Sequence, residues 1–84
     1  MDYVARTPKQ LGQLLKSCRV QQERTQSAVG SKVGIKQSTV SILEADASTA
    51  RISTLYKLLS ALNLELVVRD RSETPSAKSQ EREW

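Results

Sequence analysis

Apolar residues recur along most of this chain at helical spacing, and the first such stretch opens with a clear start signal. Thr7 is placed to cap a helix, Pro8 suits its first position, and Gln10 can reach back as a capping-box partner. The pattern predicts a first helix from residue 7 to about residue 22. Its buried face is expected to consist of Leu11, Leu14, Leu15 and Cys18.

A second, shorter stretch follows and ends at a glycine. Thr25 is expected to cap this helix, and its inward-facing residues are expected to be Ala28, Val29 and Val33. Gly34 stands just after the last turn, where a left-handed backbone ends a helix and only glycine adopts it without steric cost. The pattern therefore predicts a tight turn at Gly34.

The third and fourth stretches complete a small helical domain. A third helix is expected to begin near Lys36 or Gln37, and residues 45–51 are expected to form a polar loop. The fourth helix is expected to end at Asn63. Its predicted core residues are Ile52, Leu55, Leu58, Leu59 and Leu62, and those of the third helix are Val40 and Leu43.

Residues 64–70 change to a period of two, which predicts a short β-strand. A strand needs a hydrogen-bonding partner, and the chain has no second strand of similar quality. The same segment of a second copy is the simplest partner, and a frayed extension of the fourth helix is the alternative. The residues expected in that dimer interface are Leu64, Leu66, Val67 and Val68.

These elements divide the chain into four parts. Residues 1–6 are expected to be a loose arm, 7–63 a helix-turn-helix domain, 64–70 the dimerisation strand and 71–84 a flexible polar tail. The fold class is therefore all-α, with four to five helices and one strand. The tail ends in the only tryptophan, Trp84, which either anchors in a partner's pocket or is an accident of the terminus.

The net charge of +4 is unevenly distributed along the sequence. Between residues 6 and 43 there are seven basic residues against one acid, a net +6, whereas residues 44–84 carry a net −1. Positive charge thus lies in the half of the chain that contains the predicted helix-turn-helix, where Gln37, Ser38, Thr39 and Ser41 would form an exposed polar face. Such a face, with basic flanks, is typical of a helix that enters the major groove of DNA.

Several classes of function are excluded by what the composition lacks. With one cysteine and no histidine, the chain can form neither an internal disulfide nor a standard zinc site. Catalytic mechanisms that use histidine as the general base are excluded as well. No apolar run approaches the ~20 residues of a membrane span. We therefore expect no catalysis, metal, cofactor, small-molecule ligand or membrane contact, and a cytoplasmic location. Cys18 is expected to be a buried packing thiol rather than a reactive one.

The stretch TQSAVGSKVGIKQSTVSILE resembles the helix-turn-helix of the phage-repressor-like (XRE) family, and the resemblance runs from about Leu11 to Asn63. GIKQSTVS, the later LNLELVV and a tail ending in Glu83-Trp84 further resemble the HipB-type antitoxins, whose partner is the serine/threonine kinase toxin HipA. Two departures are notable. The family usually has alanine where this chain has Gly30, and Glu23-Arg24 lacks the glycine often found before the second helix.

The resemblance assigns roles to individual residues. Arg19 and Glu44 match an ion pair between the first and third helices, with two solvated charges as the alternative, and Trp84 is expected to contact the toxin. Side chains of the third helix are implied to reach base edges, and their neighbours to hold phosphates. The implied base contacts are Lys36, Gln37, Ser38 and Ser41, and the implied phosphate contacts are Gln26, Ser27, Lys32 and Thr39.

We therefore expect a homodimeric repressor that binds a palindromic operator in nucleoid DNA, regulates its own toxin–antitoxin operon and neutralises a HipA-like kinase. A repressor without a toxin is one alternative. A protein-interaction module that has lost DNA binding is another, although the polar face and the basic flanks argue against it.

Overall fold

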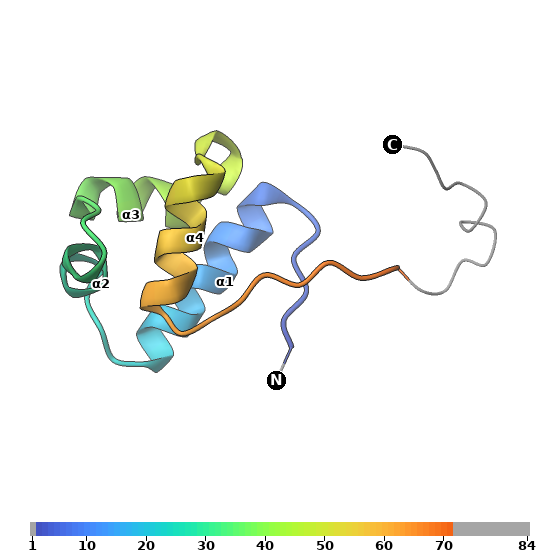
Figure 1. Cartoon of the computed structure of the whole chain (residues 1–84), viewed down its shortest axis with the longest axis horizontal. Helices are drawn as coiled ribbons and strands as arrows, with labels where there is room; N and C mark the ends of the chain where they lie inside the picture. The colour runs from blue at the N-terminus through green and yellow to red at the C-terminus, as the bar shows by residue number, and fades with distance from the viewer. Residues whose placement is uncertain (1, 72–84) are drawn as a thin grey trace.

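The computed structural model describes residues 2–71, which form an all-α domain as predicted (Figure 1). No helix in this range is long and apolar enough to cross a membrane. The elements in chain order are α1 (Pro8–Gln21), α2 (Gln26–Lys32), α3 (Gln37–Ala45), the short 3-10 turn η1 (Ala47–Thr49) and α4 (Ile52–Ala61).

The first two helices begin at the predicted caps. The Thr7 hydroxyl accepts a hydrogen bond from the backbone N–H of Gln10 at 3.1 Å, and the Thr25 hydroxyl accepts one from Ala28 at 3.0 Å. The Gln10 side chain also turns back, but its Oε1 accepts from the N–H of Arg6 at 2.7 Å, one residue before the cap. The two threonine bonds each satisfy a donor that the start of a helix would otherwise leave unpaired.

Three residues with positive φ lie just after helices in the described part of the chain. Gly34 has φ 74° and ends α2 as predicted, while Asn63 has φ 60° just after α4. Glu23, with φ 58°, adopts the same left-handed conformation between α1 and α2. The first connection therefore uses a backbone conformation that glycine adopts most readily, and here an L-residue adopts it against its steric preference.

One core joins all four helices. Its buried residues are Leu15, Val29, Val40, Leu43, Leu55, Leu58, Leu59, Ala61 and Leu62, with Leu11, Val33, Ile35, Ala47, Ala50 and Leu64 packed against them. Cys18 is also buried, and burial raises the pKa of its thiol, which fits the packing role expected for it.

Two residues expected in the core are exposed. Ala28 lies one residue, and thus roughly 100°, away from the Val29–Val33 line that faces inward. Ile52 is the first residue of α4, and helical side chains lean toward the N-terminus. Its side chain therefore extends past the end of the core and remains 64% exposed.

Helix α1 approaches α3 closely at a glycine that the sequence pattern did not single out. A β-carbon on Gly12 would lie 2.5 Å from the carbonyl oxygen of Leu43 and 2.7 Å from that of Glu44. Gly30 is likewise placed against the carbonyl of Ile35, so an alanine at this position would collide with that carbonyl. Gly12 therefore lets α1 approach the end of α3, and Gly30 lets α2 approach the turn that leads into α3.

Residues 64–71 leave the end of α4 as irregular chain (Figure 1). Leu64 packs on the core, whereas Leu66, Val67 and Val68 are exposed by 45%, 66% and 91%. Arg69 lies 3.5 Å from Asp2, so the N-terminal arm runs beside this segment. Strand pairing with a second copy stays a prediction, and Trp84 and most of the tail lie outside the described residues.

Candidate nucleic-acid interface

The outward face of α3 combines short side chains with one large apolar one. Ser38, Ser41, Ile42 and Ala45 are all exposed and follow the i, i+3, i+4, i+7 spacing of a single helix face. On the opposite face, Val40 and Leu43 are buried in the core. The helix is thus held from behind and presents an uncharged strip to the solvent.

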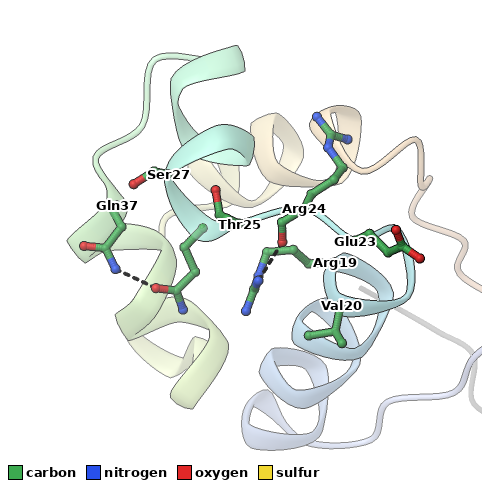
Figure 2. Close-up of a pocket in the computed structure, with 8 residues that line it drawn as sticks. Arg19, Val20, Glu23, Arg24, Thr25, Ser27 and Gln37 are labelled. Atoms are coloured by element: carbon green, nitrogen blue, oxygen red, sulfur yellow. Dashed lines mark hydrogen bonds between the residues drawn. The ribbon is translucent and has the colours of Figure 1, made fainter.

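A chain of hydrogen bonds orients the side chain at the start of α3. Gln37 Nε2 donates to Gln26 Oε1 at 2.6 Å (Figure 2). Gln26 Nε2 in turn donates to Glu44 Oε1 at 3.0 Å. Because Gln26 donates with one end of its amide and accepts with the other, it fixes Gln37 relative to the buried Glu44. The first residue of α2 therefore positions the first residue of α3.

Glu44 is the single buried charged residue in the described range, with 4% of its surface exposed. Its carboxylate receives Arg19 Nε at 2.7 Å and Arg19 Nη2 at 3.1 Å, a two-point ion pair between α1 and α3. The hydrogen bond to Glu44 raises the pKa of the Arg19 guanidinium, although burial opposes this. The ion pair implied by the family resemblance is therefore present, and the alternative of two solvated charges is wrong.

The same network continues away from α3. Arg19 Nη1 donates to the carbonyl oxygen of Arg24 at 2.8 Å, as Figure 2 shows. Arg24 in turn donates through Nη1 to the carbonyl of Ala61 at 2.7 Å, and Gln22 Nε2 donates to the carbonyl of Leu62 at 2.8 Å. These side chains satisfy carbonyls at the end of α4, which would otherwise lack partners.

The positive charge of the domain divides into internal and exposed parts. Of the seven basic residues between positions 6 and 43, Arg19 and Arg24 are engaged inside the network. Lys32, in the last turn of α2, and Lys36, the residue before α3, are both exposed on either side of the turn. These two lysines, rather than the arginines, are therefore the charges available to a ligand beside α3.

Most of the residues predicted to contact DNA are open to solvent. Thr39 and Gln26 are half-buried, so each can offer only part of its side chain. The predicted residues that are exposed are Ser27, Lys32, Lys36, Gln37, Ser38 and Ser41.

Two features of this region were missed in the sequence. Ile42 was overlooked because the Val40–Leu43 line accounts for the core without it, and its place on the outward face was the available signal. The roles of Gln22 and Arg24 had no local signal, since their partners lie 40 and 37 residues away along the chain.

An open hollow lies between the end of α1 and the starts of α2 and α3 (Figure 2). Val20, Glu23 and Ser27 line it together with the network residues. Within residues 2–71, no three His, Cys, Asp or Glu side chains gather as they would around a metal ion.

Comparison with known proteins identifies the family. A family model described as helix-turn-helix matches residues 15–68. Two relatives named Antitoxin HipB, from two strains of Escherichia coli, are each 35% identical over 80 residues, which span 93% of this chain and 85% and 91% of the relatives. This chain belongs to the HipB family of helix-turn-helix antitoxins.

Solved structures of HipB share its fold. A HipB–O4 20mer complex has a TM-score of 0.80 and 32% identity, and a HipA–HipB–O2–O3 complex has the same values. In both, the match covers 84% of this chain and all of the HipB-like chain. The α1–α4 arrangement described above is therefore the arrangement of the HipB family.

Proposed function

We propose that this chain is a sequence-specific DNA-binding repressor and antitoxin that acts in the cytoplasm on its own toxin–antitoxin operon. The observation that carries the proposal is the uncharged outward strip of α3, with Gln37 at its start held by Gln26. A side chain fixed before binding loses little conformational freedom when it contacts a base. Membership of the HipB family supports the same function, since the solved relatives are HipB complexes.

In this proposal the two helices divide the work. Gln37, Ser38 and Ser41 of α3, with Lys36 before it, contact base edges in the major groove. Gln can pair with adenine through both ends of its amide, and Lys favours the acceptors of guanine. The residues proposed to hold phosphates, which position the protein without reading sequence, are Gln26, Ser27, Lys32 and Thr39.

The segment 64–70 is proposed to join two copies. Leu66, Val67 and Val68 are apolar and exposed, and adjacent Arg69 and Asp70 would keep the segment soluble until it pairs. A two-fold dimer would place one α3 in each half of a palindromic operator.

The proposed protein partner is a HipA-like serine/threonine kinase, which this chain would bind and neutralise. A solved HipA–HipB–O2–O3 complex among its structural relatives supports this assignment. Trp84, at the end of the tail, is the proposed anchor on the kinase, because a large aromatic side chain is a frequent hot spot of binding.

DNA recognition can be tested by fluorescence anisotropy on the duplex just upstream of this gene, in ~150 mM salt with scrambled DNA as competitor. Wild type is expected to prefer the upstream duplex by roughly 1,000-fold. Gln37→Ala should lose about 1–3 kcal/mol of binding free energy per contact. Gln13→Ala, which changes another exposed glutamine, on α1, should bind as wild type does. Equal, weak binding of both duplexes by wild type would refute sequence-specific recognition.

Neutralisation needs a separate measurement with the kinase encoded beside this gene. Autophosphorylation of the kinase should fall when the chain is added in equimolar amount. Trp84→Ala should weaken this inhibition and leave DNA binding unchanged, while Gln80→Ala in the same tail should preserve both. Full inhibition by Trp84→Ala would remove Trp84 from the proposal without affecting DNA binding.

A further inference from the structure

The outward strip of α3 has one member whose chemistry the base-contact assignment does not use. Ile42 is 61% exposed, one helical turn after Ser38 and next to Ser41. The other members of the strip, including Ala45, have short side chains, so Ile42 projects furthest from the helix.

Ile42 lies outside the hydrophobic core. The core contacts of α3 are made by Val40 and Leu43, which are 0% and 3% exposed, and Ile42 is not among the residues packed against that core. A single exposed apolar residue is common on protein surfaces. Its position therefore matters more than its exposure, because it lies on the one face that DNA recognition requires.

The chemistry of the major groove offers one apolar partner on a base edge. Guanine, adenine and cytosine present only hydrogen-bond donors and acceptors there, whereas thymine also presents its C5-methyl group. Ser38 and Ser41 are short enough to let the helix come close to the groove floor. A β-branched side chain on a helix is held almost entirely in one χ1 rotamer, so the methyl groups of Ile42 point in a fixed direction.

We infer that Ile42 is a specificity-determining residue that reads the C5-methyl of a thymine in each half-site. The inference rests on the proposed DNA-binding function and assigns that site a base feature that its polar residues cannot read. Cytosine at the same position would lack the methyl and would place an N4–H donor against an alkyl group, leaving that donor without a partner. The contact therefore selects thymine over cytosine, and thymine over uracil.

The experiment removes the methyl from the DNA and the alkyl group from the protein, separately and together. Each thymine of the upstream duplex is replaced in turn by deoxyuridine, which deletes only the C5-methyl. Binding of the full-length chain is measured for wild type, for Ile42→Ala, and for Ile52→Ala as the matched control. Ile52 is a 64% exposed isoleucine on α4, outside the strip.

Wild type and Ile52→Ala are expected to lose roughly fourfold in affinity at one thymine per half-site, the value of one buried methyl group. Ile42→Ala should bind the unmodified duplex more weakly and lose no further affinity at that thymine. Deoxyuridine effects that are absent in wild type, or equal in wild type and Ile42→Ala, would overturn the inference while leaving the repressor function intact. Failure of wild type to discriminate the upstream duplex from scrambled DNA would instead refute the function and the inference together.

Discussion

Removing the guanidinium of Arg19 should destabilise this domain severely. In Arg19→Met, the Glu44 carboxylate loses two charge-assisted hydrogen bonds, at 2.7 and 3.1 Å, and keeps only the bond from Gln26. The Glu44 side chain is 3% exposed, so water cannot replace the lost donors. Breaking a buried pair in this way costs about 3–5 kcal/mol. A domain of this size has a total stability of about 5–15 kcal/mol, so the loss is a large fraction of it.

Urea unfolding followed by far-ultraviolet circular dichroism measures this loss at pH 7 and one fixed protein concentration. Arg69→Met is the matched control, because Arg69 pairs with Asp2 at 3.5 Å while both side chains are more than half exposed. Such a surface pair contributes about 0–1 kcal/mol. The double variant Arg19→Met/Glu44→Leu should recover most of the loss, since it removes both buried charges. An Arg19→Met variant no less stable than Arg69→Met would refute the reasoning.

Three further predictions concern single positions. Glu23→Gly should raise stability by about 1 kcal/mol, because Glu23 has φ 58° and glycine adopts that conformation without strain; a raised midpoint in thermal unfolding checks this. Gly12→Ala should lower stability by about 1–3 kcal/mol in urea unfolding although alanine is the better helix former, because its β-carbon would lie 2.5 Å from the Leu43 carbonyl; unchanged stability would contradict this. The backbone N–H of Ser48 donates to Asp46 and lowers the pKa of that carboxyl, so its stabilising effect is complete above the ordinary aspartate range and is lost as pH falls through the lowered value. Wild type should therefore lose more stability between pH 5 and pH 2 than Asp46→Asn, as thermal unfolding at each pH would reveal.

Local signals in the sequence were sufficient for the helices and for the turn at the centre of the interface. Thr7 and Thr25 cap their helices because a hydroxyl three residues before a free backbone N–H needs no distant partner. Gly34 marks its turn for a similar reason, since its positive φ is a property of one residue. Helical periodicity likewise located Val40 and Leu43 in the core.

Features that depend on contacts between distant segments were not predictable from the same signals. From the sequence alone, Gly12 is simply an unfavourable residue for a helix. Its role becomes clear only from the structure, where α3 lies too close to Gly12 for a β-carbon. Gln22 and Arg24 are two polar residues among many until the end of α4 lies within their reach. The Arg19–Glu44 pair also spans distant segments, and it was accessible beforehand only through family resemblance, because 25 residues separate the partners.

The hydrogen bonds from Gln22 and Arg24 to the end of α4 also bear on how two such chains would measure DNA. They tie the end of α4, from which residues 64–70 depart, to the same hydrogen-bond network that holds Gln37 at the start of α3. Two copies joined through that segment would then hold their two α3 helices at a set distance from each other. The number of base pairs between half-sites would become part of what the protein reads, fixed by the shape of a single chain rather than by a linker.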